Sequence, residues 1–146
     1  MPEFTLSASC TGSAEEVWKL LYDPFRFSEW WCGTTRVEDV TDDTAVRYVA
    51  EWPDFPYPTR VTTRSDGVRV VISCLLSDIV QEWTLEPAGR GCTIRLHVEV
   101  PPSEAGRLAA VQGEMEASMP RLVAAAEHAD GARDAPAGPP DRTGTA

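Results

Sequence analysis

Positive charge is scarce in this chain of 146 residues. Lysine and arginine number 13 against 23 aspartate and glutamate residues, so the formal net charge is −10, and Lys19 is the single lysine. Binding to nucleic acids relies on basic side chains that neutralise phosphates, and docking on an anionic membrane needs the same charges. The composition therefore argues against both kinds of partner.

Long hydrophobic runs are absent as well. No apolar stretch approaches the ~20 residues that a membrane-spanning helix requires, and no charged-then-apolar leader follows Met1. We therefore expect a cytoplasmic protein without stable membrane insertion. At this length the usual expectation is one domain with its own core, independent of disulfides or metals.

The familiar catalytic and metal-binding motifs are missing too. The sequence has no CxxC, no HExxH, no glycine-rich phosphate loop and no Ser-His-Asp order. His97 alternates with apolar neighbours and is expected to face solvent, and His128 lies near the end of the last predicted helix. We expect neither a metal nor another cofactor.

Four cysteines are present, each in an apolar setting. Without metal-like spacing, and in a reducing compartment, they are expected to be reduced and mostly buried. If the first and last strands pair antiparallel, Cys10 falls opposite the start of the strand that contains Cys92. Whether these two thiols are joined is left open.

The first thirty residues predict a strand and two short helices. Residues Glu3–Ser9 alternate apolar and polar positions, which is typical of a strand with one buried face. Ser13 and Glu16 match the N-terminal capping box of a helix, and Pro24 suits the first turn of a second helix. That helix carries Trp30–Trp31, and two adjacent helical residues are not expected to face the same interior.

From residue 34 onward the hydrophobic period changes to two, which predicts six further strands and then a long helix. The strands are expected over Thr34–Val40, Val46–Trp52, Thr59–Ser65, Val68–Leu76, Ile79–Glu86 and Cys92–Val100, with hairpin turns at Asp66–Gly67 and Ala88–Gly91. The helix is expected from Ser103 to about Ala129. Residues 130–146 lack apolar periodicity and predict a disordered tail, so the folded domain is expected over residues 1–129.

This order of elements describes a helix-grip arrangement, and the residues themselves resemble the START/Bet v 1-like (SRPBCC) superfamily, in its bacterial polyketide cyclase/dehydrase-like branch. The resemblance covers Phe4 to about Ala129. It rests on Ala14–Trp18, on Asp23–Pro24 followed by Trp30, on Trp83–Leu85 and on Gly91–Thr93, although Cys92 stands where the family more often has Thr. It implies an α+β fold, with a curved seven-stranded antiparallel sheet wrapped around the long helix and two short helices between the first two strands.

The resemblance also implies an apolar cavity for a lipid, polyketide, sterol or other hydrophobic ligand. Tryptophans are the first candidates to line it, because each offers a large apolar area at a small cost in entropy. The candidates are Trp30, Trp31, Trp52 and Trp83. Plain core packing is the alternative for each of them.

Further candidates come from the long helix and from a loop. Val111, Met115 and Met119 lie on the inward stripe of the helix, where methionine suits an irregular ligand, and core packing is again the alternative. Phe55 and Tyr57 lie in a proline-rich loop that is unusually aromatic. They are expected either to form a lid over the cavity or to cover the edge of the sheet.

Two polar side chains are predicted to enter the cavity. The alternation that places Trp83 inward also places Gln81 inward. If Trp52 faces inward, Tyr48 does so too and Arg47 faces outward. These groups are able to polarise a ligand carbonyl, or they satisfy each other in the core. Glu114 is assigned to the wet side of the long helix.

Three functions remain in consideration, and a homodimer is possible in each. The first is the binding of a hydrophobic small molecule by a carrier or sensor, and the second is a polyketide aromatase/cyclase-like enzyme. The third is a chaperone-regulator-like interaction module. A sealed apolar cavity favours the binder, an open cavity with an inward Arg, Tyr or acid favours the enzyme, and a filled core with an exposed apolar patch favours the interaction module.

Overall fold

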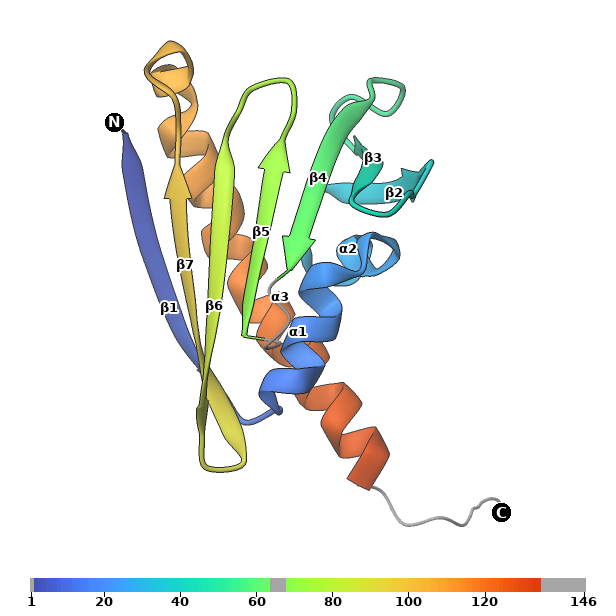
Figure 1. Ribbon diagram of the computed structural model, residues 1–146, viewed down its shortest axis with the longest axis vertical. Helices are drawn as coiled ribbons and strands as arrows, with labels where there is room; N and C mark the ends of the chain where they lie inside the picture. The colour runs from blue at the N-terminus through green and yellow to red at the C-terminus, as the bar shows by residue number, and fades with distance from the viewer. Residues whose placement is uncertain (1, 64–67, 135–146) are drawn as a thin grey trace.

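The computed structural model describes residues 2–63 and 68–134. In these residues a seven-stranded antiparallel sheet, in the order β1-β7-β6-β5-β4-β3-β2, is combined with a long C-terminal helix (Figure 1). The elements in chain order are β1 Glu3–Cys10, α1 Ala14–Tyr22, the 3-10 helix η1 Pro24–Arg26, α2 Phe27–Trp30, β2 Thr34–Glu38, β3 Thr44–Val49, β4 Tyr57–Thr63, β5 Arg69–Cys74, β6 Val80–Ala88, β7 Gly91–Glu99, the 3-10 helix η2 Pro102–Arg107 and α3 Leu108–Asp134. The helix-grip prediction is confirmed.

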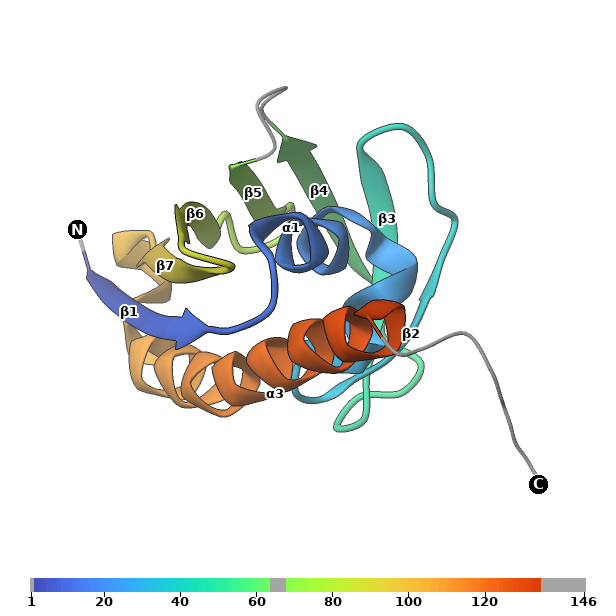
Figure 2. The ribbon, with the colours of Figure 1, turned by 90° about the horizontal axis from the view of Figure 1, so that it is seen from below.

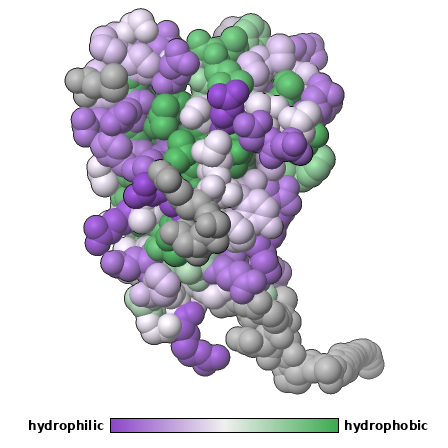
Figure 3. Space-filling model, viewed as in Figure 1, coloured by the Kyte–Doolittle hydropathy of each residue, from purple (hydrophilic) through white to green (hydrophobic). Residues whose placement is uncertain are grey.

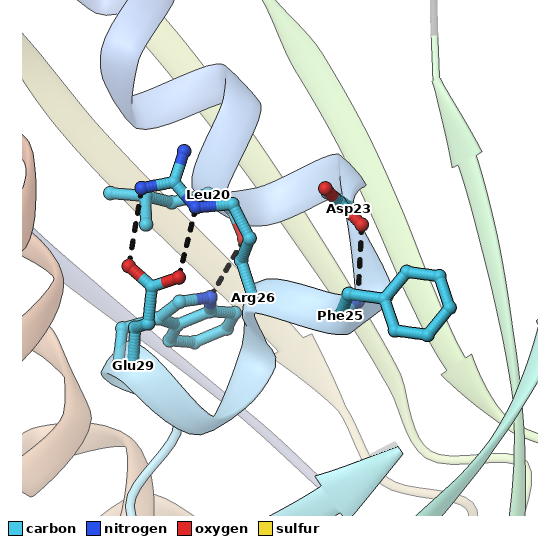
Figure 4. A network of polar contacts seen from close by, with 6 residues as sticks. Leu20, Asp23, Phe25, Arg26 and Glu29 are labelled. Atoms are coloured by element: carbon cyan, nitrogen blue, oxygen red, sulfur yellow. Dashed lines mark hydrogen bonds and ion pairs between the residues drawn. The ribbon is translucent and has the colours of Figure 1, made fainter. Parts of the chain in front are cut away.

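The corner between α1 and α2 forms as the capping residues predict. The Ser13 side chain accepts a hydrogen bond from the Glu16 amide and begins α1, while the Asp23 carboxylate accepts one from the Phe25 amide and begins η1. Arg26 pairs with Glu29 through two hydrogen bonds, and these polar contacts surround the turn (Figure 4). The two caps therefore provide acceptors for amides at the N-termini of α1 and η1, which have no partner within the helix.

The first strand of the chain, at one edge of the sheet, pairs with the last. Cys10 lies opposite Cys92 in the register of β1 and β7, as predicted, and both side chains are buried. The predicted turn at Ala88–Gly91 also forms, with β6 ending at Ala88 and β7 beginning at Gly91. The predicted hairpin at Asp66–Gly67 lies outside the described residues.

Several element ends differ from the expectation. The strand expected to reach Trp52 ends at Val49, because residues 50–56 leave the sheet before β4 begins. The long helix is preceded by the 3-10 segment η2 and ends at Asp134 rather than near Ala129. The helix therefore extends into the first residues of the predicted tail, and residues 135–146 lie outside the described part.

The helices are arranged on the concave side of the sheet. Seen from below, α1 lies between the sheet and α3, and α3 runs beside β1 and past α2 (Figure 2). The core that they enclose contains Val17, Leu20, Trp30, Trp83, Leu96 and Met115, all fully buried. None of the helices within residues 2–63 and 68–134 has both the length and the apolar character needed to cross a membrane.

The edge where β1 meets β7 leaves no room for a side chain at residue 91. A Cβ atom added to Gly91 would lie only 2.0 Å from the carbonyl oxygen of Cys10, whereas one added to the helical Gly113 would meet nothing within 4 Å. We expect Gly91→Ala to lower the free energy of unfolding by about 2 kcal/mol, since the backbone of β1 must shift. Gly113→Ala is expected to raise it by about 0.5–1 kcal/mol through backbone entropy.

Urea denaturation of the two variants beside the unchanged protein measures both effects. Equal stability of Gly91→Ala and the unchanged protein would contradict the close approach of β1 and β7.

Candidate functional site: a cavity with a buried arginine

A cavity of about 270 Å³ lies between α3 and the strands β3 to β6, and it is partly open to solvent. Buried side chains form its floor, among them Trp31, Arg47, Thr59, Ile72 and Gln81. Exposed side chains of Glu51, Trp52, Arg107 and Ala110 form its rim. The remaining lining residues are Gly33, Val49, Tyr57, Cys74, Ser77, Ile79, Val111 and Glu114.

A chain of aromatic rings connects this floor to the core. Trp30 and Trp31 are stacked with ring centroids 5.5 Å apart, and Trp30 meets Trp83 edge to face at 5.3 Å. The indole nitrogen of Trp30 donates to the Leu20 carbonyl, and that of Trp83 donates to Oε1 of Gln81 at 3.0 Å. The indole N–H groups of Trp30 and Trp83 therefore both have a partner, and the rings hold α2 against β6.

The two adjacent tryptophans are both buried, contrary to the expectation that a helix separates them. The helix α2 ends at Trp30, and Trp31 follows in an extended conformation, so helical geometry does not keep the two rings apart. Trp30 is fully buried, while Trp31, only 4% exposed, contributes one face to the cavity. Trp30 is thus a core residue, and Trp31 is the indole that borders the site.

The prediction of which residue of β3 faces inward is wrong. Ala45, Arg47 and Val49 face the interior, and Tyr48 lies on the other face beneath the guanidinium of Arg36. The prediction counted the period of two backward from Trp52. Because the strand ends at Val49, the position of Trp52 does not show which residues of β3 face inward. Trp52 is 58% exposed and belongs to the rim instead.

Arg47 is the most unusual side chain of the floor, because it is 9% exposed. Its guanidinium carbon lies 3.9 Å from the ring centroid of Trp31, and its Nη1 donates to Oγ1 of Thr34 at 3.1 Å. Its Nε is buried without a hydrogen-bond partner. Burial lowers the pKa of Arg47 from its ordinary value, and the negative charge of Glu114 opposes that shift.

Glu114 is part of the cavity rather than the wet side of the helix. Its Oε2 accepts a hydrogen bond from the indole nitrogen of Trp31 at 2.8 Å. One turn later on α3, the hydroxyl of Ser118 donates to the backbone carbonyl of Glu114 and accepts from the Cys32 amide. The segment that follows α2 is thereby fixed to α3 at the place where Trp31 and Glu114 meet.

The other predicted site residues divide between the cavity and the core. Trp31, Trp52, Tyr57, Gln81 and Val111 line the cavity, as do Arg47 and Glu114, which the sequence reasoning did not place there. Trp30, Trp83 and Met115 are fully buried in the core, and Met119 borders a separate hollow between β1 and α3. Phe55 is half exposed and is not a lining residue, although its ring contacts that of Tyr57.

A signal for Arg47 was present in the pairing of strands. Arg47 lies opposite Tyr57, and Ala45 opposite Thr59, so these residues share one face of the sheet. In β4, Thr59 and Val61 are buried and the residue between them is exposed. With the strand pairing known, this pattern would have shown which residues of β3 face the interior. Within the described residues, no group of three His, Cys, Asp or Glu side chains is placed to hold a metal ion.

The fold and this cavity define a helix-grip protein with an internal chamber. The chain belongs to the family described as "Polyketide cyclase / dehydrase and lipid transport", whose model matches residues 1–127. The resemblance inferred from the sequence motifs is thereby confirmed.

Solved structures support the same fold at low sequence identity. The protein XoxI from Bacillus cereus has a TM-score of 0.70 at 14% identity, with 86% of this chain and 96% of that chain covered. Protein CV1439 from Chromobacterium violaceum has a TM-score of 0.67 at 15% identity, over 86% of this chain and 96% of that one.

A further similar structure is DynU16, from the dynemicin biosynthetic locus, with a TM-score of 0.62 at 19% identity, over 88% of this chain and 48% of that one. Among curated proteins, no match is found.

A buried cation with an unused donor is expected to contribute little to stability. Replacement of a buried charged group by an apolar one of similar length is often neutral or stabilising, because the desolvation cost disappears. We therefore expect Arg47→Met to unfold at a free energy within about 1 kcal/mol of the unchanged protein, or above it. Trp83→Ala, which removes a fully buried indole, is expected to lose about 3–5 kcal/mol.

Chemical denaturation monitored by circular dichroism compares the two variants. A loss of more than about 2 kcal/mol in Arg47→Met would show that Arg47 is a structural residue.

Proposed function

We propose that this protein binds a hydrophobic small molecule in the cavity beneath Trp31, as a carrier or sensor. The observation that carries the proposal is the lining itself. Aromatic and aliphatic side chains (Trp31, Val49, Ile72, Ile79 and Val111) line the cavity together with polar ones such as Arg47, Gln81 and Glu114, and a combination of apolar surface with placed polar groups is typical of small-molecule sites. Membership of a family described by lipid transport supports the same proposal.

The size of the cavity limits the ligand. At about 270 Å³ it is near the lower end of the range usual for ligand sites, so a medium-length acyl chain or a small ring system fits better than a large polycyclic molecule. The partly open rim at Trp52 offers a route for entry. A long ligand would extend past this rim into solvent.

A polyketide aromatase/cyclase-like enzyme is the second candidate, and it is favoured by the feature expected to distinguish it from a binder, an open cavity with an inward arginine or acid. An arginine and a carboxylate, Arg47 and Glu114, enter the same partly open cavity. A guanidinium in a site of low polarity stabilises a developing enolate, and a carboxylate is able to accept a proton. Incubation with a linear poly-β-ketone thioester tests this function: catalysis requires a changed ratio of cyclised products, and Glu114→Gln must abolish the change.

The interaction module is the least favoured function. The described interior contains a cavity rather than being filled, and the face shown in Figure 3 has hydrophobic side chains interspersed with hydrophilic ones. The large exposed apolar residues of the described part are Tyr22, Phe25, Trp52, Phe55, Leu75 and Leu76. Of these, Trp52 already belongs to the rim of the cavity.

A cavity-filling substitution tests the binding function. We expect Val111→Trp to occupy the cavity and weaken the binding of anilinonaphthalene sulfonate by about tenfold or more, since an indole displaces the volume that the dye needs. Ala124→Trp is the matched control, because Ala124 lies on the same helix beside the hollow between β1 and α3. Fluorescence titration gives both affinities.

The same preparations are suitable for native mass spectrometry. We expect the unchanged protein to retain a hydrophobic molecule from the expression host and Val111→Trp to lose it. Equal dye affinity in both tryptophan variants, together with no co-purified molecule, would rule out ligand binding in this cavity.

A further inference from the structure

Arg47 is a buried cation that forms no salt bridge within the described residues. The salt bridges formed by residues 2–63 and 68–134 involve other basic side chains, and none of these bridges includes Arg47. A buried charge without a counter-ion is costly. Its presence at 9% exposure, on the floor of a cavity, therefore calls for a negative group that comes from outside the chain.

The charged residues around the cavity do not pair directly with Arg47. Glu114 is the strongest opposing charge on Arg47, but the two form no salt bridge, and Oε2 of Glu114 accepts a hydrogen bond from the indole of Trp31 instead. Glu51 lies on the exposed rim. Arg107, on the same rim, is paired with Glu104 at 3.1 Å and adds positive charge.

The donors that remain on Arg47 have a defined chemistry. Thr34 accepts one N–H of Nη1, and Nε is covered by the surrounding protein, so the N–H groups that remain on Nη1 and Nη2 are the donors left for a ligand. Guanidinium N–H donors match the oxygens of a carboxylate. The ring of Trp31 lies 3.9 Å from the guanidinium carbon and keeps its plane in place, so little entropy is lost when the anion binds.

We propose that the ligand of this cavity carries a free carboxylate, which binds to the guanidinium of Arg47 while its hydrocarbon part contacts Val49, Ile72 and Val111. The proposal rests on the proposed function and specifies its ligand as an amphipathic acid rather than an ester, thioester or alcohol. Gln81 contributes a second polar contact. Its Oε1 already accepts from Trp83, so its amide nitrogen is the part left for the ligand.

The proposal is tested with three ligands of equal chain length: octanoate, octan-1-ol and methyl octanoate. We expect the unchanged protein to bind octanoate about tenfold or more tightly than either neutral analogue, because a charged hydrogen-bonded pair forms only with the acid. In Arg47→Met this preference is expected to disappear, while the affinity for octan-1-ol stays within about twofold. Isothermal titration calorimetry measures each affinity.

Two further variants separate the role of Arg47 from general charge and from misfolding. Arg107→Met removes the cation on the rim and is expected to keep the preference for octanoate. Arg47→Lys keeps a charge but has no planar fork, so it is expected to restore only part of the preference. Thermal unfolding followed by circular dichroism establishes that each variant is folded.

The outcomes are distinguishable. Binding of all three ligands with equal affinity would overturn the carboxylate assignment and leave the proposed binding function standing. A preference that survives in Arg47→Met and vanishes in Arg107→Met would overturn the role of Arg47. Failure of all three ligands to bind the unchanged protein would overturn both proposals.

Discussion

The contact between the ring of Trp31 and the guanidinium of Arg47 is the interaction on which the site depends. It joins the segment after α2 to strand β3, and through Glu114 the same indole is bound to α3. Three segments of the chain are thereby held around one cavity. Arg47 packs against this ring and also lines the cavity. Because a charged group is a poor neighbour for apolar side chains, further apolar packing does not fill the interior at this place.

The aromatic chain from Trp31 through Trp30 to Trp83 gives this arrangement its rigidity. Each ring is fixed by a neighbour, and the indole nitrogens of Trp30 and Trp83 bond to Leu20 and Gln81. The polar groups of the cavity are therefore positioned by the core and not by mobile surface loops. Such preorganisation is useful to a binding protein, because less entropy is lost when the ligand arrives.

The fold could be predicted from the sequence, because its signals are local. The cap at Ser13, the proline at Pro24 and the alternation along Cys92–Val100 each fix one element, and the family motifs fix their order. The cavity could be predicted only in part. Trp31, Gln81 and Val111 follow from periodicity, whereas Arg47 depends on the register between β3 and β4, which is a non-local property.

The error at Tyr48 has a physical origin. The period of two was counted from Trp52, but the chain leaves the sheet after Val49, so the two faces of β3 were assigned from a residue outside the strand. Glu114 was misplaced for a different reason: charged residues on a helix usually face water, whereas this carboxylate accepts a hydrogen bond from Trp31.

The pairing of β1 with β7 has a consequence for how the chain folds. β1 is synthesised before β7, which is the last strand before α3, and it cannot pair until β7 has been made, since Glu3 pairs with Glu99 and Cys10 with Cys92. The hairpins between β2 and β7 are local and form early, whereas closure of β1 carries a large loop entropy. Until β7 emerges from the ribosome, the apolar face of β1 has no strand to cover it, and this interval is when the nascent chain is most exposed to aggregation.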